Sequence, residues 1–366
     1  MKLVTTTLVG PGTVELLDAA LASVEPFVDV CIVVATDDSV TERDCKRAAQ
    51  RAGIHGKRLS FHRWGWRDDF GRARNECLDL AKAAGADWSL LLDTDERYLC
   101  DEPEVLRMML SKQKAEALFV WHGSRSYSQA RLVQIPCGIR YSGRTHEAFP
   151  AYLVPNETTE LLRFVDVPKT PEQMEHKLLR DLQLLTQSTL EDPTSTRAWF
   201  YLGQTRQGFK DHSGAVLAYD RCAELRGWDE ESAWACYRAA ECLCELGQWQ
   251  AAIDRCGVGL TRHAGVSELA WLAGFASYKL GRFADAVSWS QMSAATGKWR
   301  NQGGHIKRIG FNHPPGLWEG PFNVMACAYR ELGILDAAHL SGSTARWAEE
   351  YRVNGKPPPE KSAPTE

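Results

Sequence analysis

The sequence lacks any apolar run close to the roughly 20 residues that a helix needs to cross a bilayer, so we expect no membrane-spanning segment. It also lacks a basic excess: 43 Lys and Arg stand against 47 Asp and Glu, and the net charge is −4. A broad nucleic-acid surface needs such an excess, so nucleic acid is not an expected partner. Residues 1–4 enter a strand-like pattern without the layout of a signal peptide, which predicts a cytoplasmic protein.

The sequence also gives no sign of a disulfide framework or a zinc site. The eleven cysteines are an odd number and are scattered through apparent core positions, as reduced thiols are. Cys242 and Cys244 are one residue apart and have no partner pair at zinc-site spacing. What the chain does have is length and apolar content. Its 366 residues predict two domains, and 44% hydrophobic residues are enough for ordinary cores.

The first half alternates short apolar runs with amphipathic stretches. Helical spacing predicts helices over residues 13–24, 42–52 and 69–84, with Asp69 capping the last. Strand-like patterns cover residues 3–9, 28–35, 59–64, 88–92, 117–121, 130–134 and 161–165. Strands that alternate with helices predict an α/β domain over residues 1–168, with a mostly parallel sheet covered on both faces.

From about Thr170 the strand signals stop and a repeat begins. A glycine is followed by a bulky residue two places on and by an alanine three further on, and these units end at Ala252, Ala286 and Ala338. An earlier unit ends at Ala215, so the four alanines lie 37, 34 and 52 residues apart. Another small residue stands twelve places before each of the last three alanines. Small residues at both places let two antiparallel helices approach closely.

This spacing resembles the tetratricopeptide repeat, whose period is about 34 residues. Trp199-x-x-Leu202-Gly203 is a close match, although Arg206 stands where tyrosine is usual. We therefore predict all-α tetratricopeptide-like repeats over residues 169–352 and a disordered, proline-rich tail over 353–366, with an ordinary helical bundle as the alternative. The longest gap holds an insertion near residues 296–320, either a packing flap or a binding loop. Its polar and aromatic residues are Trp299, Arg300, His305, Lys307, Arg308, Phe311, His313 and Trp318.

The motif Asp93-Thr94-Asp95 directly follows the apolar run of residues 88–92. In open α/β sheets, ligands gather at the carboxyl ends of the strands. Two carboxylates one residue apart can share a divalent cation through hard oxygen ligands, and a cation there suits a diphosphate. The alternative is a strand that simply runs into a polar turn.

Three other polar clusters are predicted to reach the same edge of the sheet. Arginines beside a helix start favour an anion, whereas the carboxylates favour a cation, so together they fit a metal-bound diphosphate. These clusters are Thr5-Thr6-Thr7, Thr36-Asp37-Asp38-Ser39 and residues 66–75.

Two segments, separated by a predicted helix, carry a family resemblance. They are Asp69-Phe70-Gly71-Arg72-Ala73-Arg74-Asn75 and Asp87-Trp88-Ser89-Leu90-Leu91-Leu92-Asp93-Thr94-Asp95-Glu96. Together they resemble the family 2 glycosyltransferases. The likeness is strongest to the bacterial branch that includes peptide S-glycosyltransferases, whose patterns are D-F-S-x-A-R-N and D-W-x-L-x-L-D-A-D-E. Tyr141-Ser142-Gly143-Arg144-Thr145-His146-Glu147 is similar to its G-R-x-H-E segment. Gly71 replaces the serine and Thr94 the alanine, which the sequence suggests are mild changes. The resemblance covers about residues 1–165.

This resemblance implies the GT-A fold, a nucleotide-sugar donor that is commonly a UDP-sugar, a Mn²⁺ or Mg²⁺ ion, and inversion at the anomeric carbon. It implies Asp93, Asp95 and His146 as metal ligands. Glu147 is the candidate general base, and Asp95 acts in catalysis through the metal. The predicted donor site is Thr6, Asp37, Asp38, Arg72, Arg74, Asn75, Asp93 and Arg144.

Each role has a structural alternative. His146 can be a core histidine, Glu147 a supporting carboxylate, Arg74 a partner of Asp69 or Asp95, and Arg144 a turn cap.

One departure concerns the donor base. The family commonly has an aspartate at the end of the second strand, where this chain has Ala35. The nucleotide is therefore read differently, or the loop is shifted.

The helical repeats favour a peptide or protein acceptor, because their surface can hold an extended segment. A glycan or modified-DNA acceptor, and repeats that only form a homodimer, are the alternatives. A different class also stays open: a catalytically decayed first domain would leave a repeat-based interaction protein.

Overall fold

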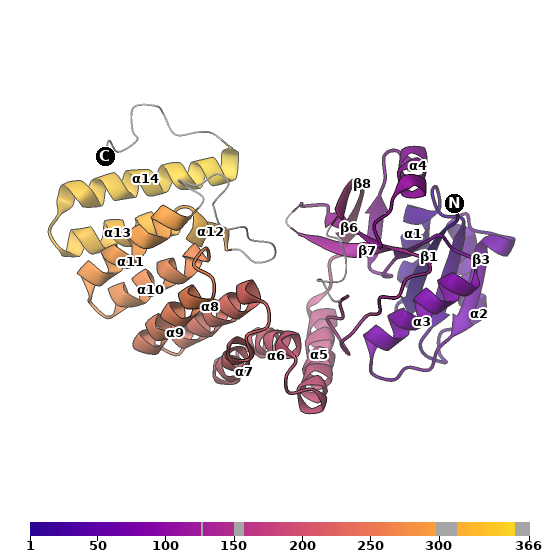
Figure 1. Cartoon of the computed structure of the whole chain (residues 1–366), viewed down its shortest axis with the longest axis horizontal. Helices are drawn as coiled ribbons and strands as arrows, with labels where there is room; N and C mark the ends of the chain where they lie inside the picture. The colour runs from indigo at the N-terminus through magenta and orange to yellow at the C-terminus, as the bar shows by residue number, and fades with distance from the viewer. Residues whose placement is uncertain (126, 150–156, 298–312, 356–366) are drawn as a thin grey trace. The chain divides into compact units, whose positions relative to one another are not determined.

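The computed structural model describes residues 1–125, 127–149, 157–297 and 313–355 (Figure 1). The chain divides into two compact units, Met1–Lys177 and Leu178–Glu366. The division falls inside helix α5 (Pro171–Glu191), so the first unit ends at Lys177 where residue 168 was predicted. No helix in the described part of the chain is long and apolar enough to cross a membrane.

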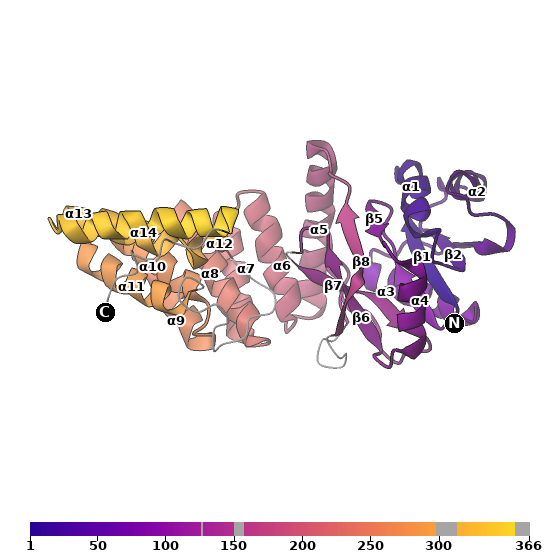
Figure 2. The ribbon, with the colours of Figure 1, turned by 90° about the horizontal axis from the view of Figure 1, so that it is seen from above.

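The N-terminal unit contains one eight-stranded sheet in the order β3-β2-β1-β4-β7-β6-β8-β5. Figure 2 shows β1 beside β2, a pair that runs parallel. Its strands are β1 (Leu3–Val9), β2 (Val30–Ala35), β3 (Leu59–Arg63), β4 (Trp88–Leu91), β5 (Glu96–Leu99), β6 (Ala117–His122), β7 (Ser128–Gln134) and β8 (Glu157–Asp166). Its helices are α1 (Val14–Val24), α2 (Glu42–Arg51), α3 (Phe70–Ala83) and α4 (Pro103–Lys112), with a 3₁₀ turn at Gly56–Arg58.

The sheet is mixed, and its first four strands, β3, β2, β1 and β4, form a parallel half. Strand β6 also runs parallel to β8, whereas β7 is antiparallel to both β4 and β6, and β5 is antiparallel to β8. The prediction of a mostly parallel sheet therefore misses the two antiparallel strands, β7 and β5. For β7 the physical reason is the short link between β6 and β7, because a tight turn can join only antiparallel strands.

The parallel half is covered on both faces, as predicted. Alternate residues of β2 point to opposite faces, so Val33 packs in the same core as α1, α2 and α4, whereas Ile32 packs with α3. All of β2 after its first residue is buried, which explains its unbroken apolar run. Helix α4 and strand β5 were not predicted. Helix α4 begins with Pro103, a residue that is favoured at a first helical turn.

The described residues of the C-terminal unit are helical and contain no strand, which confirms the prediction of an all-α second half. After α5 the helices are α6 (Thr196–Gly208), α7 (His212–Leu225), α8 (Asp229–Glu245), α9 (Trp249–Arg262), α10 (Ser267–Lys279), α11 (Phe283–Thr296), α12 (Pro314–Leu317), α13 (Gly320–Glu331) and α14 (Leu335–Asn354). Residues 298–312 of the predicted insertion and 356–366 of the predicted tail lie outside the described residues. Val353 and Asn354, predicted to begin the tail, belong to α14.

Small residues lie where paired helices meet. A Cβ atom on Gly203 of α6 would stand 2.7 Å from the ring of Tyr219 in α7. One on Gly274 of α10 would stand 2.6 Å from Ser290 Oγ in α11. The repeated glycines of the motif have a second role. Gly247, Gly281 and Gly333 have φ of 71°, 74° and 73°, the left-handed conformation in which a helix commonly ends.

Two glycines in helix interiors should therefore respond oppositely to alanine. Gly203→Ala is expected to destabilise the unit by about 1–3 kcal/mol, because the new methyl group overlaps the buried Tyr219 ring. Gly257→Ala in α9 is the matched control. No atom would lie within 4 Å of a Cβ atom at this position, and alanine favours a helix by up to about 1 kcal/mol over glycine. Urea unfolding of both variants measures the difference, and equal midpoints would contradict the close contact.

Candidate active site

The predicted carboxylates lie at the topological switch point of the sheet. From β1 the chain builds β2 and β3 on one side and then crosses to β4 on the other side of β1. Ligands of open α/β sheets bind at the carboxyl ends of the two strands that flank such a point. Asp93 and Asp95 follow β4 almost at once, so their place in the topology is the one expected of a ligand site.

Five charged side chains form a network around Asp93. Arg74 Nη2 of α3 lies 3.1 and 3.2 Å from the two carboxylate oxygens of Asp93, and Arg74 Nε donates to Glu147. Arg131 Nη1 of β7 lies 3.3 Å from Asp93 Oδ2, and Arg131 Nη2 donates to Glu96 of β5. Both arginine side chains are more than 90% buried, whereas that of Asp93 is 26% exposed. Arginines from two elements, α3 and β7, thus hold one carboxylate, and each arginine is held in turn by a second carboxylate.

Charge pairing decides the protonation of this network. Burial disfavours the charged form of Asp93, but Arg74 and Arg131 outweigh it and hold the pKa of Asp93 below its ordinary value. Burial raises the pKa of Glu96 to about 8, opposed by Arg131 and assisted by the charge of Asp93. The two arginines thus favour the ionised form of Asp93, whereas burial favours the protonated form of Glu96. Nη1 of Arg74 and Nε of Arg131 are buried without a hydrogen-bond partner among the described residues.

Helix α3 and the segment of residues 141–147 are fastened to each other. Asn75 Nδ2 donates to the Tyr141 carbonyl at 3.0 Å, and Tyr141 N donates back to Asn75 Oδ1 at 2.8 Å. Phe70 N donates to the Arg144 carbonyl at 2.8 Å. These bonds place Glu147 at Arg74. The two motifs of the family resemblance, far apart in the sequence, are therefore in direct contact.

The first turn of α3 is not open to an anion. The N–H of Phe70 is bonded as above, that of Gly71 donates to the Gly143 carbonyl at 3.1 Å, and that of Arg72 donates to the Asp69 side chain at 2.8 Å. The predicted Asp69 cap is confirmed. The prediction that this helix start binds phosphate is wrong, because its free N–H groups already have protein acceptors.

Gly71 is required by this contact. A Cβ atom at this position would lie 2.7 Å from the Gly143 carbonyl oxygen, and backbone cannot easily move aside. The expectation that glycine for serine is a mild change is therefore wrong.

Gly71→Ser, which restores the residue usual in the resembling family, is expected to destabilise the unit by about 1–3 kcal/mol and to push the 141–147 segment away. Gly65→Ser is the control, since a Cβ atom at Gly65 would have nothing within 4 Å. Urea unfolding compares the two variants. A Gly71→Ser protein as stable as Gly65→Ser would contradict this packing.

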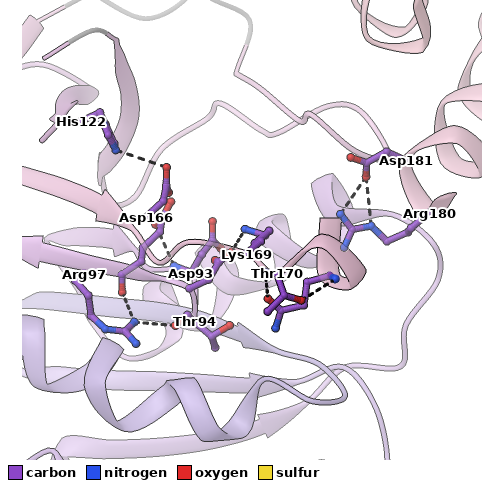
Figure 3. Close-up of polar contacts among 12 residues, drawn as sticks. Asp93, Thr94, Arg97, His122, Asp166, Lys169, Thr170, Arg180 and Asp181 are labelled. Carbon is purple, nitrogen blue, oxygen red and sulfur yellow. Dashed lines mark hydrogen bonds and ion pairs between the residues drawn. The ribbon is translucent and has the colours of Figure 1, made fainter. Parts of the chain in front are cut away.

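Asp95 has a different kind of partner from Asp93. Its carboxylate forms an ion pair with Lys169, a residue between β8 and α5 that Figure 3 labels beside Asp93 and Thr170. Both side chains of the pair are 31% exposed. The backbone of Asp95 is also fixed, because Val167 N donates to its carbonyl at 2.7 Å.

Several predicted donor-site residues lie elsewhere or are otherwise engaged. Thr6 lies inside β1, level with Leu91, and is 1% exposed, so it does not follow the strand as expected. Arg72 is mostly exposed and pairs with Asp69 at 3.3 Å. Arg144 Nη1 donates to the Asp68 carbonyl at 2.9 Å, which is the turn-capping alternative.

Asp37 and Asp38 follow β2, at the expected edge of the sheet. The Asp37 carboxylate accepts hydrogen bonds from Ser39, and these bonds lower its pKa. Asp38 is exposed and its Oδ1 lies 3.3 Å from Arg63 Nη1. Neither aspartate contacts the network around Asp93 through a bond in the described structure.

The three-ligand metal site is not assembled. Among residues 1–125, 127–149, 157–297 and 313–355, no three His, Cys, Asp or Glu side chains gather as a group that could hold a metal ion. His146 therefore does not join Asp93 and Asp95 in such a group. It is half-buried, and its φ of 50° is left-handed.

Three residues of the site were not predicted from the sequence: Glu96 as a network member, Arg131 and Lys169. Arg131 carried a usable signal, since it is a lone charge in the predicted strand of residues 130–134 and a buried charge needs a partner. Lys169 carried none, because a lysine before a helix is ordinarily exposed.

No protein-family model matches the chain. The chain is similar to a tetratricopeptide repeat protein. The TPR repeat-containing protein Synpcc7942_0270 of Synechococcus elongatus is 35% identical over 139 residues, which are 36% of this chain and 32% of that protein. The chain thus spans about a third of the length of the curated relative that it matches.

Among solved structures, MamA is similar over 51% of this chain and 99% of its own, with 15% identity and a TM-score of 0.39. YrrB, described as a TPR protein with an unusual peptide-binding site, is similar over 47% of this chain and 78% of its own, with 13% identity and a TM-score of 0.37. The GT-A resemblance rests on the sequence motifs alone.

Proposed function

We propose that the helical unit binds a peptide or protein segment. The observation that carries this proposal is the series of helix pairs α6–α7, α8–α9, α10–α11 and α13–α14, joined through small residues such as Gly203 and Gly274. Stacked helix pairs form an extended surface that can hold a chain segment. The similarity to a tetratricopeptide repeat protein supports the same function.

Hydrogen exchange tests this proposal without knowledge of the natural partner. Peptides are selected from a random library on the full chain, and exchange is then measured with and without the selected peptide. We expect slower exchange in helices of residues 178–355. Protection confined to residues 1–125, 127–149 and 157–177 would contradict binding by the repeats.

The N-terminal unit has a second candidate function, which we propose to be sugar transfer from a UDP-sugar. The observation that favours it is the position of Asp93 and Asp95 at the switch point, where buried Arg74 and Arg131 pair with Asp93. This placement combines two carboxylates with fixed positive charge, which suits a metal-bound diphosphate. The opposing hypothesis is that the N-terminal unit has lost its catalytic activity and that the protein acts only through binding by the repeats.

The side chains at this motif fit a divalent cation of the Mg²⁺ or Mn²⁺ kind. Asp93 and Asp95 offer hard oxygen atoms, and the Lys169 ammonium already stands at Asp95 as a cation would. Mg²⁺ in nucleotide sites is held by one or two protein carboxylates together with phosphates and water, so a third protein ligand is not needed. When bound, the ion would offset charge that develops on the leaving diphosphate.

The remaining roles belong to the protein's own side chains. Arg74 and Arg131 orient the Asp93 carboxylate from two sides and keep it ionised. Glu147 is bonded to Arg74, a geometry that suits orientation of the guanidinium. Its role as the base that removes the acceptor proton stays a prediction. The acceptor is proposed to be a peptide or protein held by the repeats, with a glycan or modified DNA as the alternatives.

A further inference from the structure

The two carboxylates of the Asp93-Thr94-Asp95 motif are not equivalent. Asp93 is held by two arginines whose side chains are 9% and 6% exposed and which each bind a second carboxylate. Displacing either arginine would leave a buried charge without a partner, which is strongly unfavourable. Asp95 is held by one lysine that is about a third exposed. Only the partner of Asp95 can move into water at low cost.

The position of Lys169 is set by its surroundings. On one side, Val167 N donates to the Asp95 carbonyl at 2.7 Å. On the other, Thr170 N donates to Gln173 Oε1 at 2.9 Å and Gln173 N donates to Thr170 Oγ1 at 3.3 Å, a reciprocal cap that fixes the start of α5. The backbone on both sides of Lys169 is therefore fixed by hydrogen bonds, and the lysine side chain is paired with Asp95.

A lysine is well suited to give up this position. Its ammonium is a compact, strongly hydrated point charge on a flexible stem, whereas an arginine forms a rigid two-pronged contact. A divalent cation that approaches Asp95 competes directly with this ammonium for the same carboxylate oxygens. Removing the lysine also adds one unit of uncompensated negative charge at the motif.

We propose that Lys169 holds Asp95 until a divalent cation arrives with the nucleotide, and that the cation displaces it. This inference rests on the proposed transferase function. Lys169 thus sets how tightly the motif binds metal. Metal binding breaks the ion pair of Lys169 and Asp95, which is one of the two contacts between Asp95 and the segment before α5.

The test is the affinity for Mn²⁺ in the presence of UDP, followed by the electron paramagnetic resonance signal of free Mn²⁺. Lys169→Met is expected to bind Mn²⁺ about two- to fivefold more tightly than wild type, the factor that corresponds to an exposed ion pair. Arg140→Met is the matched control. It removes one positive charge from the exposed pair of Arg140 and Asp79, joined at 2.6 Å, which contacts none of the site residues through a described bond.

Amine labelling of the wild-type protein gives a second measurement. Adding Mn²⁺ and UDP is expected to raise the labelling rate of Lys169, read from its peptide by mass spectrometry, because the released ammonium enters water.

The outcomes separate this inference from the proposed function. Equal Mn²⁺ affinity in wild type and Lys169→Met, or an unchanged labelling rate while Mn²⁺ binds, overturns the role of Lys169 and leaves the metal site standing. Failure of Mn²⁺ to bind either protein, with Asp95→Asn indistinguishable from both, overturns the metal site and this inference together.

Discussion

Asp95→Asn is expected to lower the hydrolysis and transfer of a UDP-sugar by at least about 100-fold, with little change in stability. The amide removes one negative charge and one hard oxygen ligand from the proposed metal site. The metal there is proposed to offset the charge of the leaving diphosphate, and removing such stabilisation usually lowers the rate by about this factor. The stability cost is small because the ion pair of Asp95 and Lys169 is partly exposed and contributes at most about 1 kcal/mol. Release of UDP, followed by chromatography with and without Mn²⁺, measures the effect.

Asp101→Asn is the control for this variant. It makes the same chemical change at a carboxylate that is 87% exposed and that pairs with Arg163 at 3.6 Å, without a described contact to the site. It should release UDP at the wild-type rate. An Asp95→Asn protein with full, metal-dependent activity would exclude Asp95 from the chemistry and favour the interaction-protein alternative.

Arg74→Met is expected to destabilise the protein by about 3–5 kcal/mol. The substitution leaves the Asp93 and Glu147 carboxylates without their shared cation, and breaking a buried ion pair from one side costs about this much. Arg72→Met, two residues earlier on the same helix, is the control. Its side chain is 68% exposed, so a change within about 0.5 kcal/mol is expected. Urea unfolding at pH 7 compares the two variants.

A double substitution separates lost charge pairing from lost packing. Asp93→Asn in the Arg74→Met background removes one of the two carboxylates that Arg74 leaves behind, so part of the lost stability should return. Equal stability of Arg74→Met and Arg72→Met, or a double variant whose losses simply add, would contradict a coupled network around Asp93.

The parallel half of the sheet could be predicted because its signals are local. Continuous apolar runs such as residues 88–92 occur where both faces of a strand are covered. The start of α3 could be predicted because aspartate, here Asp69, is a favoured N-cap residue. The repeats could be predicted for the same reason. A glycine that ends one helix and an alanine that contacts the next recur at nearly fixed spacing.

The network around Asp93 could be predicted only in part, because its members come from distant segments. Arg74, Asp93 and Glu147 belong to motifs, whereas Arg131 and Glu96 take part only because β7 lies antiparallel beside β4 and β5 follows the motif at once. Strand direction is decided by tertiary packing, and no residue pattern in this half specifies it. The close approach of Gly71 to the Gly143 carbonyl likewise depends on how two distant segments meet.

Calorimetric titration of UDP into the full chain, with and without Mn²⁺, tests the central claim most directly. We predict saturable binding of one UDP per chain when Mn²⁺ is present, at least tenfold weaker binding without it, and loss of this difference in Asp95→Asn. UDP binding that is absent in both conditions, or equally strong in both and unaffected by Asp95→Asn, would contradict a metal-bound nucleotide at this acidic pair.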